Sequence, residues 1–213
     1  SFIDIPSRMA WVFPLKTRNM KTIFDHYRSV VKQIENQTKR TVRAFRSDNE
    51  FKNHYFSDFH RDKGIDEQFC PPYEKDYNGI PERFNRTIMD IVRTLLSQAG
   101  LPQSFWPWAL MAANYVRNLC PTRANGRDVS PYQLFYGKIP RVGHLRTFGC
   151  KTMAKVQDKH KLETRSEPSI LIGYNPGANS YLCLSLSKPW VVYNTPSVEF
   201  FESTLKPWRT ERT

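Results

Sequence analysis

The sequence predicts an α/β domain that is followed by a small all-β domain. As far as about residue 140, strand-like runs alternate with segments whose apolar residues recur every three or four positions. From about His144 onward, short β-rich runs alternate with turns. The 213 residues are 39% hydrophobic and 14% aromatic, which is enough for two hydrophobic cores and argues against wholesale disorder.

The first domain is expected to begin with two strands joined by a tight turn at Pro6-Ser7-Arg8. The expected strands are residues 1–5, 9–16, 41–48 and 65–70. The expected helices begin near residues 20, 51, 79, 104 and 132. Lys63-Gly64 is expected to end the second helix, because glycine adopts the left-handed conformation of a helix C-cap at little cost. As far as the helix that begins near residue 104, the order ββ-α-β-α-β-α-α is typical of an RNase H-like fold, a mixed five-stranded sheet flanked by helices, with one early strand not recognised.

The second domain is expected to be a small all-β SH3-like barrel. Its expected β-rich runs are residues 147–156, 169–174, 181–186 and 190–201. Turn residues at 175–179 and at Lys188-Pro189 separate these runs. The predicted domains are therefore residues 1–140, in which the first strand is truncated, and residues 141–205, followed by a tail at 206–213.

The formal net charge of +12 and the isoelectric point near 9.7 favour a polyanionic partner over a merely soluble basic protein. Aromatic residues lie among the basic ones, which favours nucleic acid over a membrane surface. No run of residues approaches the ~20 apolar residues that a membrane span needs, and there is no leader of the secretory type. We therefore expect a nucleic-acid partner and no membrane.

The cysteines and histidines do not form a metal-binding pattern. The four cysteines contain no C-x-x-C pair, and the five histidines contain no H-x₃₋₅-H pair. We therefore predict no zinc site, and buried free thiols of an intracellular protein rather than disulfides.

Three carboxylates are candidate ligands for a divalent cation. Asp48 ends the third strand-like run, Glu82 lies at the start of the third helical segment, and Asp4 lies in the first strand-like run. Hard cations such as Mg²⁺ prefer oxygen ligands, so the three acids could converge on one or two ions. Each acid also has a structural alternative, because Asp4 could close a turn, Asp48 could cap a helix, and Glu82 could complement a helix dipole.

The residues around these acids resemble the catalytic core of retroviral-type DDE integrases from copia-type LTR retrotransposons. The matching segments are residues 2–16 (FIDIPSRMAWVFPLK), 46–49 (RSDN), 71–73 (PPY), 78–83 (NGIPER), 104–106 (SFW), 131–132 (PY) and 144–150 (HLRTFGC). They occur in the family's order and cover nearly the whole chain. The chain resembles a fragment of a Pol polyprotein in which the integrase core is followed by its SH3-like domain.

The resemblance implies a metal-dependent polynucleotidyl transferase that trims the element's DNA ends and joins them to target DNA. Two Mg²⁺ or Mn²⁺ ions are implied, with Asp4 bridging them and Asp48 and Glu82 binding one each. The implied partners are double-stranded DNA, both element ends and target, and further copies of the chain in a multimer on that DNA. The implied location is the nucleus or a cytoplasmic retroelement particle.

Basic residues are expected to hold the DNA backbone beside the acids. Arg83 and Arg86 share the helix of Glu82, and the family places a basic residue one turn after that acid. In the second domain, Lys159, Lys161 and Arg165 make the first loop basic, which favours a further DNA contact. Residues 73–77 are expected to form a mobile loop at the active site, where Glu74 and Asp76 could bind ions or repel DNA.

The chain departs from the family pattern directly after Asn49. Two residues, one of them usually a glycine, are missing there, so Asp48 and Glu82 are two residues closer in sequence than usual. The family's zinc-binding module, which normally precedes the core, is also absent. These departures leave open a catalytically inactive remnant that only binds DNA, whereas the retention of all three acids favours the enzyme. An RNase H acting on RNA–DNA hybrids is a third alternative, but it usually carries a fourth acid that we could not place.

Overall fold

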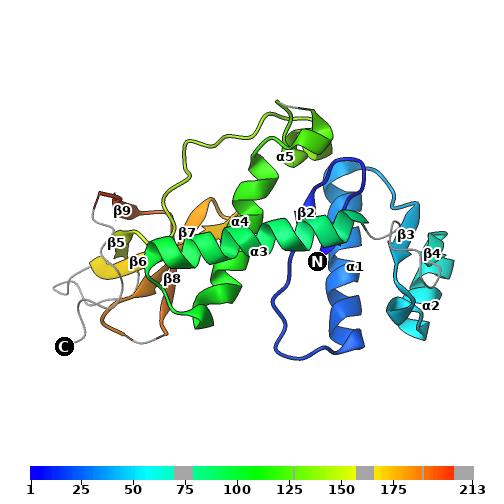
Figure 1. Ribbon diagram of the computed structural model, residues 1–213, viewed down its shortest axis with the longest axis horizontal. Coiled ribbons are helices and arrows are strands. Elements are labelled where there is room, and N and C mark those ends of the chain that lie inside the picture. The colour runs from blue at the N-terminus through cyan, green and yellow to red at the C-terminus, as the bar shows by residue number, and fades with distance from the viewer. Residues whose placement is uncertain (70–78, 127, 157–165, 189, 204–213) are drawn as a thin grey trace. The chain divides into compact units, whose positions relative to one another are not determined.

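The computed structural model describes residues 1–69, 79–126, 128–156, 166–188 and 190–203 (Figure 1). These residues form an α/β protein with a five-stranded antiparallel sheet in its C-terminal part, which confirms the predicted fold class. The chain divides into two compact units. The first comprises Ser1–Thr87 and Asn118–Pro140, and the second comprises Ile88–Arg117 and the described residues from Arg141 onward. The last segment of the first unit ends at Pro140, near the predicted boundary between the two domains. Residues 88–117, which fall in the predicted first domain, pack within the second unit.

The first unit contains two pairs of strands. The strands are β1 (Phe2–Ile3), β2 (Ala10–Trp11), β3 (Ala44–Ser47) and β4 (Asp66–Phe69). Strands β1 and β2 pair antiparallel, and β3 and β4 pair parallel, in register from Ala44↔Asp66 to Ser47↔Phe69. Among the described residues the predicted mixed five-stranded sheet is therefore present only as these two ladders. One physical reason is that the side chain of Asn118, and not a further strand, hydrogen-bonds to the main chain of β2 at Ala10.

The helices confirm the predicted order. They are α1 (Met20–Thr38), α2 (His54–Lys63), α3 (Gly79–Ala99), α4 (Trp106–Leu119) and α5 (Pro131–Tyr136), with short 3₁₀ turns at Asn49–Phe51, Gln103–Phe105 and Arg123–Asn125. Local chemistry sets their ends. The Asn19 carboxamide accepts hydrogen bonds from the amides of Lys21 and Thr22 at the start of α1. Gly64 ends α2 in the left-handed conformation, with φ of 67°, as predicted.

The core of the first unit is an aromatic cluster on α1, α2 and β3. Phe56 of α2 is fully buried, and the ring centroids of Phe24, Tyr27 and Phe45 lie 5.3–5.4 Å from its own. Aromatic pairs at these separations are worth about 0.5–1.5 kcal/mol each beyond the area that they bury. Phe2 packs against the same cluster, so β1 is attached to it as well.

A buried polar network crosses this core. His60 of α2 is 1% exposed, its Nδ1 lies 2.6 Å from Glu67 Oε1 of β4, and its Nε2 lies 3.0 Å from the Tyr27 hydroxyl of α1. Burial next to Glu67 raises the pKa of the Tyr27 hydroxyl well above its ordinary value, so Tyr27 stays neutral and can donate. The network satisfies polar groups that would otherwise be costly to bury, and it ties α1, α2 and β4 together.

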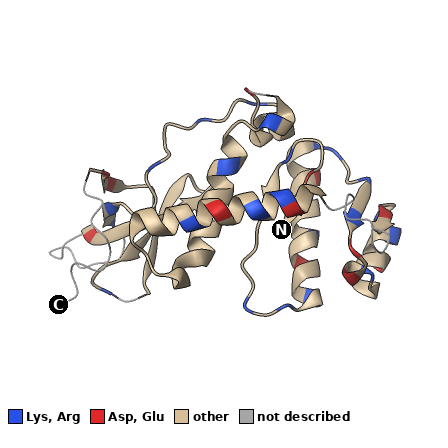
Figure 2. Cartoon of the chain, viewed as in Figure 1, with Lys and Arg blue, Asp and Glu red and all other residues tan. Residues whose placement is uncertain are grey.

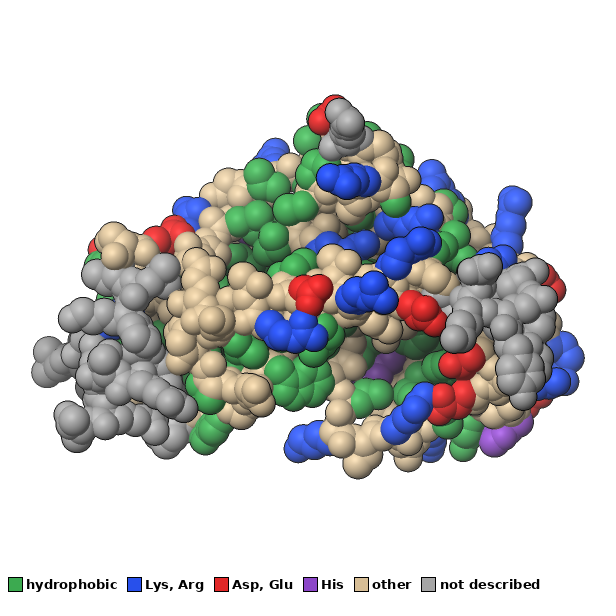
Figure 3. All heavy atoms as spheres, viewed as in Figure 1, with side chains coloured by type: hydrophobic (Ala, Val, Ile, Leu, Met, Phe, Trp, Pro, Cys, Tyr) green, Lys and Arg blue, Asp and Glu red, His purple; other side chains and the backbone are tan. Residues whose placement is uncertain are grey.

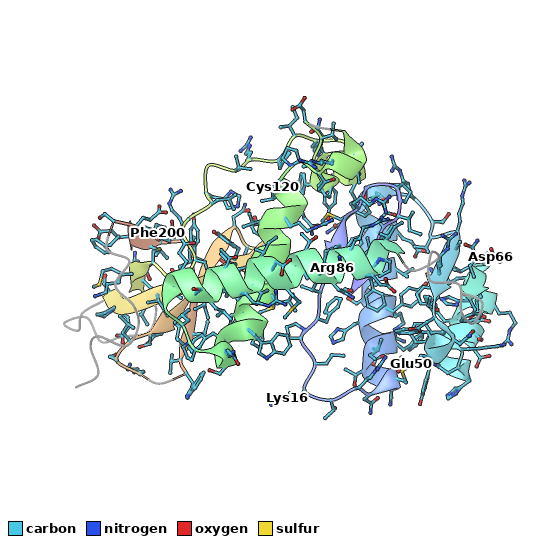
Figure 4. All side chains as sticks on the ribbon, viewed as in Figure 1. Lys16, Glu50, Asp66, Arg86, Cys120 and Phe200 are labelled. Carbon is cyan, nitrogen blue, oxygen red and sulfur yellow. The ribbon has the colours of Figure 1, made fainter. Side chains whose placement is uncertain are left out.

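The second unit is built on one antiparallel sheet. Its strands are β5 (Lys151–Lys155), β6 (Ser166–Asn175), β7 (Ser180–Ser185), β8 (Val192–Thr195) and β9 (Val198–Phe201), in the order β8-β7-β6-β5-β9. The four β-rich runs of the sequence are therefore confirmed as strands, the last of them divided into β8 and β9. Cys150, Ala154, Leu171 and Cys183 form the fully buried centre of this unit. Tyr174, Tyr181, Val198 and Phe200 pack around it, and Phe200 is labelled in Figure 4.

The described cysteines are free, but the prediction that the free thiols are buried is wrong for Cys120. Cys150 and Cys183 are buried, whereas Cys120 is exposed; Cys70 lies outside the described residues. Burial raises the pKa of the Cys183 thiol to about 11 and that of Cys150 to about 12. Within the described part of the chain, no helix is long and apolar enough to cross a membrane.

Gly149 occupies a position that other residues cannot take without strain. Its φ is +79°, and its amide donates to the Leu171 carbonyl oxygen at 2.8 Å. A Cβ atom built on Gly149 would overlap Ala99 Cβ and lie 3.3 Å from Ala99 Cα. The glycine therefore permits the close approach of the segment just before β5 to the end of α3 within the second unit.

We expect Gly149→Ala to lower the free energy of unfolding by about 2–4 kcal/mol, because it adds both a left-handed strain and an overlap with Ala99. Urea denaturation monitored by circular dichroism measures this loss. Gly143→Ala is the matched control, because no atom lies within 4 Å of the added Cβ and φ is not in the left-handed region. A loss of the same size in both variants would contradict this account of Gly149.

We expect iodoacetamide at pH 8 to modify Cys120 in the native chain and to leave Cys150 and Cys183 unmodified. The two buried thiols have raised pKa values, so few of them ionise at this pH, and burial also blocks the reagent. Peptide mass spectrometry after native and denaturing labelling measures the difference. Rapid native labelling of Cys183 would contradict the buried position.

Candidate active site and nucleic-acid interface

Asp4 lies at the turn of the β1–β2 hairpin and is half-buried. Its Oδ2 accepts hydrogen bonds from the Ser7 amide at 3.0 Å and from the Ser7 hydroxyl at 2.5 Å. Its own amide donates to the Met9 carbonyl, and its carbonyl accepts from the Arg8 amide, both at 2.8 Å. Arg8 takes a left-handed φ of 63°, which a residue with a Cβ adopts only under strain. Asp4 therefore closes the turn with one carboxylate oxygen, and Oδ1 accepts no hydrogen bond from the described residues.

Asp48 directly follows β3, and its side chain is exposed. It stands at the N-cap position of the 3₁₀ turn Asn49–Phe51, but its side chain makes no capping hydrogen bond. The structural alternative, in which Asp48 caps a helix, is thus not realised. The carboxylate also makes no ion pair with any described residue, so both of its oxygens are available to a ligand.

The shortened connection after Asn49 closes without backbone strain. Asp48 has an ordinary extended conformation, with φ of −74° and ψ of 171°, and no residue from Asp48 to Asn53 has a positive φ. The 3₁₀ turn spans the gap, and Glu50 forms an ion pair with Arg18 (Glu50 is labelled in Figure 4). The missing glycine is therefore not needed for the backbone path that the chain takes here.

Glu82 is exposed in the first turn of α3. The helix begins at Gly79, as predicted, and Pro81 in its first turn sacrifices no intrahelical hydrogen bond. Phe84 and Ile88 are buried and anchor the inner face of the helix, which leaves Glu82 on the outer face. The Ser1 hydroxyl donates to Asn85 Oδ1 at 3.3 Å, so the beginning of β1 lies beside the helical turn that follows Glu82.

All three predicted acids lie in the first unit, but the described residues do not form a closed metal site. Among them, no group of three or more His, Cys, Asp or Glu residues could hold a metal ion. The donor chemistry fits a hard cation, because Asp4 keeps one carboxylate oxygen, and Asp48 keeps two, without a hydrogen bond from described residues. The arrangement does not fit a three-acid site, so the metal assignment stays a prediction.

Arg83 and Arg86 are both exposed on α3, and Arg86 is labelled in Figure 4. Neither forms an ion pair with a described residue, whereas Arg93 farther along the helix pairs with Asp90. Figure 2 shows basic and acidic residues along α3. Figure 3 shows Lys and Arg side chains exposed on the face of the molecule that is seen in this view. The charges of Arg83 and Arg86 are therefore available to a phosphate backbone.

The other predicted DNA contacts and the predicted active-site loop lie outside the described residues. They are Lys159, Lys161, Arg165 and the loop at residues 73–77.

Sequence reasoning missed three residues that contact the Asp4 hairpin: Ser7, Asn118 and Asn125. The Asn118 carboxamide accepts from the Ala10 amide at 3.1 Å and donates to the Ala10 carbonyl at 2.8 Å. The Asn125 carboxamide donates to the Ser7 carbonyl at 2.6 Å. One signal was present, because Asn114 and Asn118 are four residues apart in an otherwise largely apolar helix and are both buried.

Comparison with known proteins relates the chain to retroelement polyproteins. Residues 150–213 match the family described as the retroviral polymerase SH3-like domain. The chain is 32% identical over 188 residues to the retrovirus-related Pol polyprotein from transposon RE1 of Arabidopsis thaliana, which covers 87% of this chain and 13% of that protein. It is 33% identical over 210 residues to the retrovirus-related Pol polyprotein from transposon TNT 1-94 of Nicotiana tabacum, which covers 97% of this chain and 16% of that protein. The chain thus spans a small part of the length of these relatives.

A solved structure shows the same fold. A chain in the cryo-EM structure of the simian T-cell lymphotropic virus intasome, in complex with the PP2A regulatory subunit B56 gamma, superposes with a TM-score of 0.52. The two chains are 16% identical, and the superposition covers 91% of this chain and 68% of that one.

The SH3-like match and the Pol polyprotein relatives relate the chain to retroelement Pol proteins, and the structural neighbour shows the same fold. The chain belongs to the retrovirus-related Pol polyproteins of copia-type retrotransposons, as its sequence motifs indicated.

We expect Arg86→Ala to weaken DNA binding and to reduce the salt dependence of binding by about one phosphate contact. Fluorescence anisotropy with a labelled duplex, measured over a range of KCl concentrations, gives this slope. Arg28→Ala on α1 is a matched control that removes one exposed arginine of the same unit. Equal slopes for Arg86→Ala and the unchanged chain would remove Arg86 from the DNA interface.

Proposed function

We propose that this chain is the catalytic part of an integrase that trims the ends of the element's DNA and joins them to target DNA. The observation that carries this proposal is the state of Asp48. Its carboxylate stands exposed at the end of β3, in a position where it could cap the following turn, yet it makes no such hydrogen bond. A carboxylate without a structural partner, in a chain related to Pol polyproteins over most of its length, is best explained by a ligand.

In this proposal Asp4, Asp48 and Glu82 would together hold two Mg²⁺ or Mn²⁺ ions. When bound, such ions would supply Lewis-acid chemistry to a phosphodiester. The chain's own contribution is to present carboxylate oxygens on three separate elements, the β1–β2 hairpin, the end of β3 and the first turn of α3. The described residues do not hold the three acids as one closed group. The proposal therefore requires that a bound cation or DNA would bring the three acids together.

Arg83 and Arg86 have the role of positioning the DNA backbone in this proposal. They lie one and four residues after Glu82 on the same helix, so phosphates bound by them would lie beside that acid. The net charge of +12 supports double-stranded DNA, of element and target, as the partner. Work on paired DNA ends would use a multimer of the chain, in the nucleus or in a retroelement particle.

A second candidate function is DNA binding without catalysis. The observation that favours it is the absence, among the described residues, of a three-acid group that could hold a metal ion. In that case the exposed arginines would bind DNA and the acids would be inherited without a present role.

A strand-transfer and nicking assay on labelled duplex DNA with Mn²⁺ separates the two candidates. We expect the unchanged chain to be active and Glu82→Gln to lose more than about 100-fold of that activity. Such a loss exceeds the effect of removing a residue that only hydrogen-bonds to a metal ligand. Glu199→Gln, on β9, removes one exposed carboxylate as a control and should keep the activity. Equal inactivity of all three chains, with salt-sensitive DNA binding retained, would overturn the catalytic proposal in favour of DNA binding alone.

A further inference from the structure

Trp190 is an exposed aromatic residue between β7 and β8 of the second unit. Its side chain is 70% exposed, whereas that of Trp106, also at the surface, is 39% exposed. A single exposed apolar residue needs no explanation by itself, because such residues are common on protein surfaces. The backbone conformation of Trp190 and the contact on one face of its ring set it apart from an ordinary surface residue.

The main chain at Trp190 has a conformation that is costly for a bulky residue. The Val191 amide donates to the Lys188 carbonyl at 3.4 Å, which closes a four-residue turn with Trp190 at its third position. Trp190 has a φ of 63°, the left-handed conformation that glycine or asparagine ordinarily supplies at such a position. Strained residues of this kind cluster at functional sites. The chain thus keeps a tryptophan where a glycine would adopt the backbone conformation more easily.

The Trp190 ring is oriented by a buried aromatic side chain of the same unit. Its centroid lies 5.8 Å from that of Phe105, and the two ring planes differ by 21°, so the rings are stacked. Phe105 ends the 3₁₀ turn that precedes α4 and is 2% exposed. One face of the indole therefore lies over Phe105. Because the side chain is 70% exposed, its other face is open to solvent.

Hydrogen bonds hold the turn that carries Trp190. The Ser185 amide donates to the Val191 carbonyl at 2.9 Å, and the Ser185 hydroxyl accepts from the Lys188 amide at 2.9 Å. The same hydroxyl donates to Oε1 of Glu167, a buried carboxylate of β6, at 2.9 Å. The indole is thus presented in a defined position, so little conformational entropy is lost when a ligand contacts it.

The chemistry of this surface favours a nucleobase as the ligand. An open indole face with a second ring stacked beneath it matches the flat face of a base, and aromatic side chains bind unpaired bases in this way. The formal net charge of +12 favours a polyanion over an apolar protein partner. Lys188, two residues before Trp190, is exposed and forms no ion pair with a described residue, so its charge is available to a phosphate.

We propose that Trp190 is a stacking site for an unpaired base of single-stranded nucleic acid, with Lys188 on the adjacent phosphate. In duplex DNA the faces of each base are covered by its neighbours, so only unpaired nucleotides offer a face to the indole. This inference rests on the nucleic-acid partner of the proposed function but not on its chemistry, because neither the three acids nor a metal ion takes part. It adds unpaired nucleotides to double-stranded DNA as a ligand of the chain.

The test measures binding to three labelled probes by fluorescence anisotropy, on the full chain in EDTA. The probes are an oligothymidylate of about 15 nucleotides, an abasic strand of the same length, which keeps the phosphates and lacks the bases, and a duplex of that length. Trp190→Gly removes the ring and relieves the left-handed strain, whereas Trp190→Phe keeps an aromatic ring. Phe201→Leu is the matched control, because it removes another exposed aromatic side chain of the same unit, on β9.

We expect the unchanged chain to bind the oligothymidylate about 10-fold more tightly than the abasic strand, because a stacked base contributes on that scale. Trp190→Gly should bind these two probes equally. Trp190→Phe and Phe201→Leu should keep most of the preference. Binding to the duplex should be the same in all four chains, because its base faces are covered.

A preference for the oligothymidylate that survives in Trp190→Gly would overturn the inference. If that variant also has a lower melting temperature, Trp190 serves only to cover Phe105. If it instead loses a concentration-dependent self-association seen by sedimentation, the surface belongs to a second copy of the chain. If Trp190→Gly does not fold, Trp190→Leu decides, because it keeps an apolar side chain without a flat ring.

Failure of the inference and failure of the proposed function are distinguishable. If the unchanged chain binds the duplex in a salt-sensitive manner but binds the oligothymidylate no better than the abasic strand, only the stacking inference is overturned. If the unchanged chain binds none of the three probes, the nucleic-acid partner of the proposed function is overturned and the inference fails with it.

Discussion

The packing of aromatic side chains around Phe56 is the constraint on which the first unit depends. Its strands contain two to four residues each, so main-chain hydrogen bonding alone cannot orient them. The Phe56 cluster holds α1, α2 and β3 against one another, and Phe2 attaches β1 to the same cluster. Truncating a buried phenylalanine of this kind costs about 3–5 kcal/mol, a large part of the stability of a small domain. Two of the candidate acids, Asp4 and Asp48, depend on strands that this cluster positions.

The three acids are placed by three different physical means. Asp4 is held by hydrogen bonds from Ser7, Asp48 by the unstrained end of β3, and Glu82 by the first turn of α3. None of these devices requires the other two acids to be present. Folding therefore fixes each acid separately, and the described residues contain no group of three acids that could hold a metal ion. The relationship to Pol polyproteins concerns ancestry and fold, whereas catalysis depends on whether the acids meet.

The second unit packs closely around a small buried centre. Its fully buried centre combines two unionised cysteines with Ala154 and Leu171, and Gly149 allows the segment just before β5 to approach Ala99 at the end of α3. Gly149 lies in the segment 144–150 that resembles the retroelement family. Its positive φ and its contact with Ala99 are a physical reason for a glycine at this position of the segment. The segment thus has a structural role in the described chain, at the junction between helix and sheet.

The sequence by itself determined the features that depend on neighbouring residues. The Gly64 cap, the helices that begin near residues 20 and 79 and the β-rich runs after His144 all follow from local conformational preference and apolar spacing. The class of protein also followed from the sequence, through the order of its motifs. Only the tertiary structure decided which polar residues meet, such as His60 with Glu67 and Tyr27, or Asn118 with Ala10. Those hydrogen bonds join residues up to 108 positions apart, and whether they form depends on the path of the whole chain, which no local pattern records.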